Sequence, residues 1–260
     1  MLGDNKGMSP PPLALTPPQQ QILIPESTLC FTGDRNSPTK RADYTGAFLP
    51  ECKQFMSLWK IPGANHLKVN LGTSELTRYQ ALKKFITERT QATGKAPTSL
   101  VFFCHGLKNK IQLGINLTNA REFSKFIADL HTQQGGGLGS SFISPVVVLY
   151  ACSTGSGPGV GGDGGFADKF RDALCEAGLT ECRVYGHETS GHTVRNPRKR
   201  VFEGRGSTIG GTGGTWLIAP GTPMFRTWQR ELAKPSSSLR YRYAYLTLAG
   251  LHYELVTLPK

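Results

Sequence analysis

The chain has 260 residues, with 30 Lys and Arg against 18 Asp and Glu, and its formal net charge is +12 at pH 7. No stretch approaches the run of about 18 apolar residues that spans a membrane, and the N-terminus lacks a hydrophobic signal core. We therefore expect a cytoplasmic protein, with export by a dedicated secretion machine left open. Six cysteines at scattered spacing match neither a disulfide framework nor a zinc site, so we expect no metal and no cofactor.

The N-terminal residues 1–27 are rich in Pro and Gln. Such a composition buries too little apolar surface to offset the entropy lost on ordering, so a flexible arm is predicted. The remainder, 28–260, is expected to form one domain with its core at about 65–190 and a C-terminal region at about 191–260. Residues 28–63 look irregular, and we expect a strand or two with loops at the edge of the core.

Patterns of strand and helix alternate from residue 66 onward. Short β-branched or alternating apolar runs predict strands at 66–71, 99–106, 146–151 and 183–185. Amphipathic runs predict helices that begin at Ser74, at Thr118 or Asn119, and near Gly165. A small hairpin is expected at 108–115, and further short strands follow residue 186. This alternation is typical of an α/β fold with a mostly parallel central sheet and helices on both faces.

Two of these predicted strands end in a reactive side chain. SLVFFCHG ends in His105 and Gly106, and PVVVLYA leads into Cys152. Because open α/β sheets bind ligands at the carboxyl ends of their strands, the imidazole and the thiol should lie together. A histidine is the usual group that turns a thiol into a nucleophilic thiolate. Gly106 has no Cβ, so its N–H could join that of Cys152 in binding an oxyanion.

A strand-terminal cysteine is more often only a small buried hydrophobe, and this applies to each thiol taken alone. Cys104 lies next to His105 but should point to the opposite face of its strand, into the core.

The motifs VFFCHG and VVLYACSTG resemble the signature of the caspase-like (clan CD) cysteine peptidases, in which one hydrophobic strand ends in His-Gly and a later one in Ala-Cys or Ser-Cys. The 47 positions from His105 to Cys152 agree with the roughly 50 quoted for caspases. The similarity covers about residues 65–190, under half of the chain. Ser153-Thr154-Gly155 departs from caspases proper, and the glycine-rich loop that follows is more similar to bacterial CHAT and self-cleaving toxin domains.

This resemblance implies a caspase-like three-layer α/β/α sandwich and hydrolysis of protein or peptide substrates by a His105–Cys152 dyad, with self-processing or an activator required in some members. It also implies that specificity lies C-terminal to the nucleophile. Candidate substrate-binding residues are Asp163, Glu188 and Trp216, whereas Asp168 is expected to be a solvated charge on a helix face.

The densest positive run contains Arg195, Arg198, Lys199 and Arg200. It is either a solvated loop face or a site for a polyanionic activator, since inositol hexakisphosphate switches on some toxin peptidases of the clan. Nucleic acid is the weaker interpretation, because no aromatic side chains alternate with these charges. HETSGH does not match the zinc-protease motif, because its two histidines are five residues apart.

Two other functions remain open. A non-catalytic binding module could use the same fold and its basic surface, with the thiol and imidazole idle. A cysteine amidase or esterase would have a reactive thiol but cleave no protein.

Overall fold

The computed structural model describes residues 23–34, 48–134, 145–190, 196, 198–204, 213–223, 225–226 and 229, together with the backbone of 241–243 and 255–257. Structural statements below refer to these residues. The arm at 1–22 and the rest of the C-terminal region lie outside them.

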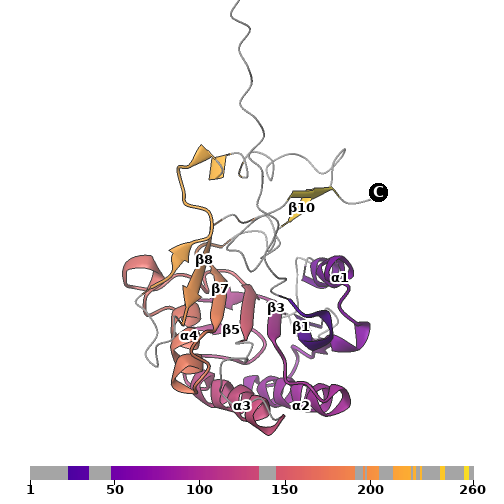
Figure 1. Cartoon of the computed structure of the whole chain (residues 1–260). Coiled ribbons are helices and arrows are strands. Elements are labelled where there is room, and N and C mark those ends of the chain that lie inside the picture. Colours follow the sequence, from indigo (N-terminus) through magenta and orange to yellow (C-terminus); the bar gives the residue numbers. More distant parts are fainter. Residues whose placement is uncertain are drawn as a thin grey trace, which may run out of the picture.

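A seven-stranded sheet forms the centre of the molecule (Figure 1). Its strand order is β2-β1-β3-β6-β7-β8-β9. The first five strands in that order run parallel, and β8 and β9 each run antiparallel to the preceding strand. Their bounds are β1 Thr28–Gly33, β2 His66–Val69, β3 Ser99–Phe103, β6 Val146–Tyr150, β7 Arg183–His187, β8 Lys199–Glu203 and β9 Thr215–Trp216.

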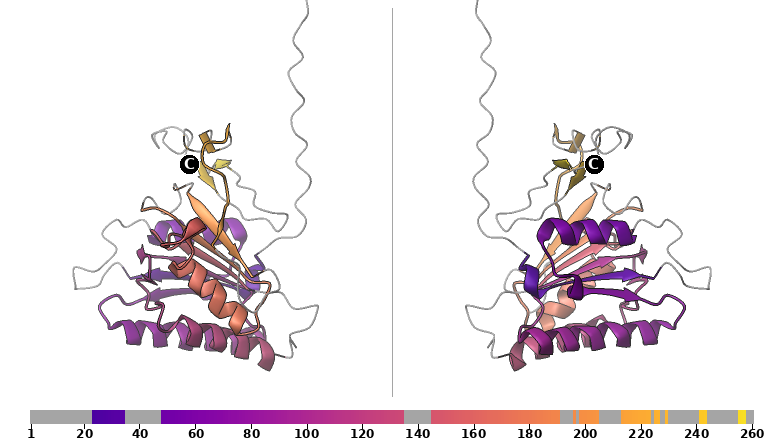
Figure 2. Two further views of the ribbon diagram at one scale, coloured as in Figure 1. Left: turned by 90° about the vertical axis from the view of Figure 1, so that its left-hand side faces the viewer. Right: turned by 90° about the vertical axis from the view of Figure 1, so that its right-hand side faces the viewer.

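Helices cover both faces of this sheet, so the predicted α/β/α sandwich is confirmed (Figure 2). One face carries α1, Phe48–Trp59, which connects β1 to β2. The other face carries the helices that connect the later parallel strands: α2 Glu75–Thr93, α3 Ala120–Gln133 and α4 Phe166–Glu176. Connections switch face between β1 and β3, and the crevice at such a switch point is where open α/β sheets bind ligands.

Each central strand divides its side chains between two apolar layers. In β3, Leu100 and Phe102 face the core under α2–α4, whereas Val101 and Phe103 face the core under α1. Every residue of β1, β3 and β6 is buried, as expected of parallel strands covered on both faces. Cys104 continues the α2–α4 side and is fully buried, as its position in the strand predicted.

The helix predictions hold closely. Ser74 caps α2, and its hydroxyl accepts a hydrogen bond of 3.1 Å from the Thr77 N–H. The run AREFSKFIADLHTQ forms α3, with Phe123 and Ile127 fully buried. A hairpin made by β4, Gly106–Leu107, and β5, Lys110–Ile111, lies where a small hairpin was expected.

The strand expected within 28–63 is present as β1, but its position at the edge and the absence of a helix were predicted wrongly. β1 lies inside the sheet between β2 and β3, and residues 48–59 form α1. Pro50 made a helix start at this point look unfavourable in the sequence. Proline is nevertheless tolerated in the first turn of a helix, where Pro50 lies in α1.

The end of the predicted flexible arm is also packed against the domain. Leu23 is buried, and 25–27 form a short 3-10 helix. The Ser27 hydroxyl lies 2.7 Å from the Thr98 hydroxyl. Toward the C-terminus, β10 Tyr241–Tyr243 and β11 Leu255–Thr257 pair antiparallel, within two segments that were predicted to be strands.

Candidate active site

The two candidate catalytic residues, His105 and Cys152, each follow the end of one of two neighbouring parallel strands, β3 and β6. Ser99 pairs with Val146 and Phe103 with Tyr150, an offset of 47 positions throughout. The pairing continues beyond the strands, because the Cys104 N–H donates to the Tyr150 carbonyl at 3.4 Å. His105 and Cys152 are separated by the same 47 positions. Phe103 and Tyr150, the last residues of the two strands, belong to the core under α1.

His105 is half-buried and held between α1 and the β4–β5 hairpin. Its ring packs edge-on against Phe48, the first residue of α1, with ring centroids 4.9 Å apart. Its carbonyl accepts a hydrogen bond of 2.9 Å from the Gln112 N–H. Phe48 therefore packs against one side of the His105 ring. No motif in the sequence predicted this contact.

Gly106 makes the closest contact between the two strand ends. A Cβ placed on it would lie 2.6 Å from the Cys152 carbonyl oxygen, 2.8 Å from Ala151 Cβ and 2.8 Å from Thr154 Cγ2. Real Cβ atoms do not approach this closely, so the position requires glycine. The His-Gly pair is thus pressed against the turn that carries the thiol.

Cys152 begins a tight turn. Ser153 has a φ of 58°, a left-handed conformation that is uncommon for a residue other than glycine. The Thr154 hydroxyl donates to the Ala151 carbonyl at 2.9 Å and closes the turn. Strained backbone of this kind occurs at functional sites when surrounding contacts enforce it.

Two neighbouring elements enforce this conformation. At the end of β7, the His187 carbonyl accepts from the Gly155 N–H at 2.7 Å, and the Thr189 carbonyl accepts from the Ser153 N–H at 3.4 Å. At the start of α4, the Ala167 N–H donates to the Thr154 carbonyl at 2.8 Å. The turn after the thiol is consequently fixed from both α4 and β7.

Exposure separates Cys152 from the other five cysteines. Cys152 is partly exposed, whereas the other five thiols are buried: Cys30, Cys52, Cys104, Cys175 and Cys182. Burial raises the pKa of the adjacent Cys104 thiol to about 12, which makes it inert as a nucleophile at neutral pH. Among the cysteines, Cys152 alone is open to a substrate in this structure.

Aromatic and basic side chains contact one another at the ends of β3, β6 and β7 and the start of β8. Phe103 stacks on Tyr150 with centroids 4.6 Å apart, and the His187 ring lies 6.1 Å from Tyr150. Lys199, which pairs with His187 across β7 and β8, places its Nζ 4.1 Å from the centre of the Tyr150 ring. A buried lysine is unusual, and Lys199 is only 1% exposed.

Burial lowers the pKa of Lys199 to about 7, while the ring face of Tyr150 favours its charged form. The pKa of an unfolded lysine is about 10.4, so between pH 7 and 10 the unfolded chain binds more protons than the native chain. Stability contributed at this position therefore rises with pH across that window. We expect the unfolding free energy of wild type, relative to Lys199→Met, to increase from pH 7 to pH 10.

Urea denaturation of both proteins at several pH values measures this difference. Lys68→Met, at an exposed position on β2, is the control and should show no pH-dependent difference from wild type. A constant difference between wild type and Lys199→Met would show that Lys199 has an ordinary pKa.

The three predicted substrate-binding residues lie in two places. Glu188 follows β7, and Trp216 is the last residue of β9. Arg200 contacts both of them. Its guanidinium stacks 3.7 Å from the centre of the Trp216 ring and donates a hydrogen bond of 2.8 Å to Glu188 Oε1. Strand alternation places Arg200 on the sheet face opposite Lys199. Asp163 instead lies in the glycine-rich loop, where its side chain packs close to Gly159 and contributes to raising the Asp168 pKa.

Within the positive run, Lys199 is buried, whereas Arg198 is exposed. Lys199 is only 1% exposed, and both Arg198 and Arg200 pair with Glu188. Arg195 lies outside the described residues. The expectation of a free polyanion site at these residues is corrected for Lys199, because a side chain buried against Tyr150 cannot reach a surface ligand.

Asp168 is likewise not the solvated charge that its helical position suggested. It is fully buried, it pairs with Arg171 at 2.5 Å, and its Oδ2 accepts from the Gly164 N–H at 2.9 Å. Burial is the main cause that raises its pKa to about 6, so it is ionised at neutral pH. It anchors the end of the glycine-rich loop to α4.

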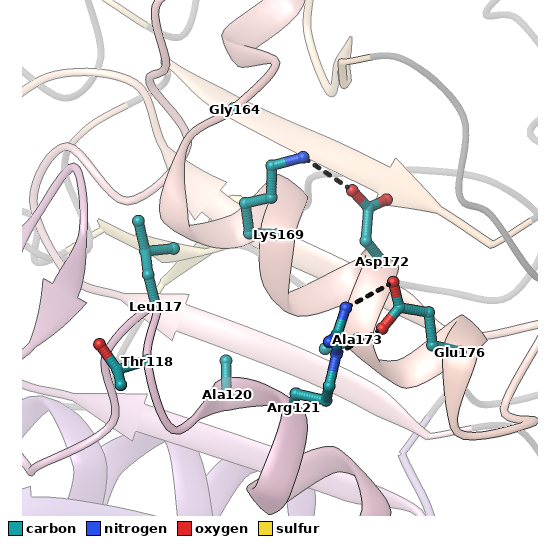
Figure 3. A pocket seen from close by; sticks show the side chains of 9 residues that line it. All are labelled: Leu117, Thr118, Ala120, Arg121, Gly164, Lys169, Asp172, Ala173 and Glu176. Atoms are coloured by element: carbon teal, nitrogen blue, oxygen red, sulfur yellow. Dashed lines mark hydrogen bonds and ion pairs between the residues drawn. The ribbon is translucent and has the colours of Figure 1, made fainter.

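A pocket lies between α4 and the start of α3 (Figure 3). It has a volume of about 480 Å³. Two ion pairs lie among its lining residues. Arg121 of α3 pairs with Glu176 of α4 at 2.8 Å, and Lys169 pairs with Asp172 within α4 at 3.2 Å. Its lining residues come from the outer helical layer, and neither His105 nor Cys152 is among them.

Among the described residues, no cluster of three or more His, Cys, Asp or Glu side chains could hold a metal ion. No described helix has both the length and the apolar character needed to cross a membrane. Comparison of the chain with models of known protein families, with curated proteins and with solved structures gave no match.

Proposed function

We propose that the protein is a caspase-like cysteine endopeptidase that hydrolyses peptide bonds with a His105–Cys152 dyad. The observation that supports this proposal is the β3–β6 pairing, because His105 and the partly exposed Cys152 each follow the carboxyl end of one of these two neighbouring parallel strands. The contact of Gly106 with the Cys152 backbone supports it, because that contact leaves no room for a side chain beside the site.

In this mechanism the Cys152 thiolate attacks the scissile carbonyl carbon and forms a thioester. The N–H groups of Cys152 and Gly106 stabilise the negative oxygen of the tetrahedral intermediate. His105 protonates the leaving amine, and a water molecule then hydrolyses the thioester and restores the thiol. The hydrogen bonds from α4 and β7 keep the turn rigid, so that the thiol needs no reorganisation before attack.

We further propose that the substrate cleft extends toward Glu188 and Trp216. Glu188 directly precedes Thr189, whose carbonyl holds the Ser153 N–H, so the Trp216–Arg200–Glu188 assembly is joined to the nucleophile turn through the backbone. Asp163 is the nearest carboxylate after Cys152 in the sequence, and its role in specificity remains a prediction.

Iodoacetamide labelling of the native protein at pH 6, read by peptide mass mapping, tests the dyad. We expect Cys152 to be labelled ahead of the five buried cysteines, and we expect that labelling to fall in His105→Ala. Cys104→Ala is the matched control, because it removes a neighbouring thiol on the opposite face and should leave the labelling of Cys152 unchanged.

Equal labelling of Cys152 in wild type and His105→Ala would contradict the dyad and favour a binding module. Strong, histidine-dependent labelling without cleavage of any peptide library would favour an amidase or esterase instead.

A further inference from the structure

A second pair of thiols lies outside the proposed active site. Cys175 is in the last turn of α4, and Cys182 immediately precedes β7. Their Sγ atoms are 3.8 Å apart, and both side chains are fully buried. A disulfide requires about 2 Å between the sulfurs, so modest side-chain rotations would join them.

The surroundings give the two thiols different roles. The hydrogen bond between Cys175 and Cys182 and the nearby Arg171 guanidinium lower the pKa of Cys175. The same hydrogen bond, together with burial, raises the pKa of Cys182. Cys175 is therefore the thiol that ionises first and reacts first with an oxidant, and Cys182 is placed to react with the product.

The backbone at Gly204 packs closely against the Cys175 thiol. A Cβ on Gly204 would lie 3.0 Å from Cys175 Sγ and 2.1 Å from the Thr180 carbonyl oxygen. The Gly204 N–H also donates to the Cys182 carbonyl at 2.9 Å. The two thiols are thus held face to face by the α4–β7 connection and the end of β8.

We propose that Cys175 and Cys182 form a reversible dithiol–disulfide site that takes a hydroperoxide as its oxidant. The proposal goes beyond the proposed peptidase activity and does not depend on it.

The chemistry balances with one peroxide per pair. The Cys175 thiolate attacks the terminal peroxide oxygen, the O–O bond breaks, and a sulfenic acid forms; the leaving oxygen takes up a proton and departs as water from hydrogen peroxide or as an alcohol from an organic hydroperoxide. Cys182 then attacks the sulfenic sulfur, the S–S bond forms, and the sulfenic oxygen leaves as water. Two electrons pass from the two sulfurs to the peroxide.

Such a bond would join the two elements that hold the Cys152 turn. The first residues of α4 bind the Thr154 carbonyl, and the end of β7 binds the Gly155 N–H. Cys175 and Cys182 lie at the opposite ends of these elements. Oxidation would therefore restrain the support of the turn without touching the turn itself.

The test uses the full chain carrying Cys152→Ala, which removes the exposed thiol, treated with a slight excess of hydrogen peroxide. Both cysteines lie in one tryptic peptide, DALCEAGLTECR, which should lose the mass of two hydrogen atoms. Cleavage after Glu176 and Glu181 should then leave the two cysteine-containing fragments, DALCE and CR, linked until a reductant is added. The melting temperature should rise by roughly 5 °C and fall back on reduction.

Cys182→Ser in the same background is the control and should show neither the linked fragments nor the rise in melting temperature. If both thiols remain fully alkylatable after peroxide treatment and denaturation, the proposal is wrong. A bond between Cys30 and Cys52 in place of this one, or irreversible oxidation of Cys175 alone, would equally overturn it.

Discussion

Hydrolysis of a cleavable peptide is expected to fall below detection, by at least about 10³-fold, when Cys152 is replaced by alanine. In the proposed mechanism the Cys152 sulfur forms the covalent intermediate, and the other five thiols are buried and could not replace it. His105→Ala should lower kcat by about 10² to 10⁴, because proton transfer to the leaving amine is lost while the thiol and the oxyanion N–H groups remain.

Steady-state kinetics on a peptide selected from a library measures both effects, with thermal unfolding as the control for folding. Both variants should unfold close to the wild-type temperature, since each removes a half-exposed side chain at a strand end. Wild-type turnover by Cys152→Ala would show that the thiol is not the nucleophile. Unchanged kcat in His105→Ala would remove the imidazole from the mechanism.

Replacement of Gly106 by alanine is expected to lower the melting temperature by roughly 3–10 °C and to reduce kcat by about 10² or more. The new methyl group would meet the Cys152 carbonyl oxygen at 2.6 Å and the side chains of Ala151 and Thr154 at 2.8 Å. One strand end must then shift away from the other, and the alignment of imidazole and thiol is lost with it.

Gly63→Ala provides the matched control, because a Cβ at Gly63 would have no neighbour within 4 Å. This variant should keep wild-type activity and stay within about 0.5 kcal/mol of wild-type stability. Were Gly106→Ala as active and stable as Gly63→Ala, the close contact between the two strand ends would be of no consequence for the site.

The thiol pair and the active site can be examined independently of each other. Oxidation of Cys175 and Cys182 is measured in a protein that lacks Cys152, whereas the dyad is measured by labelling and turnover under reducing conditions. Failure of one proposal therefore leaves the other intact.

The sequence by itself determined the elements whose patterns are local. The β-branched run Val146–Tyr150 and the amphipathic run Ala120–Gln133 form the predicted strand and helix. The Ser74 cap and the alternation that sends Cys104 into the core are also local properties. That β3 and β6, the strands before His105 and Cys152, run parallel agrees with the predicted mostly parallel sheet, and the dyad itself stays a prediction.

Only the tertiary structure decided the burial of charged residues and the position of the early elements. Lys199 and Asp168 read as solvated charges, because a sequence pattern cannot show that the Tyr150 ring or the Arg171 guanidinium will cover them. A strand in 28–63 was expected at the edge of the core, yet pairing with β2 and β3 places β1 inside the sheet. In each case the deciding contacts join segments far apart in the chain, and local propensity carries no information about such contacts.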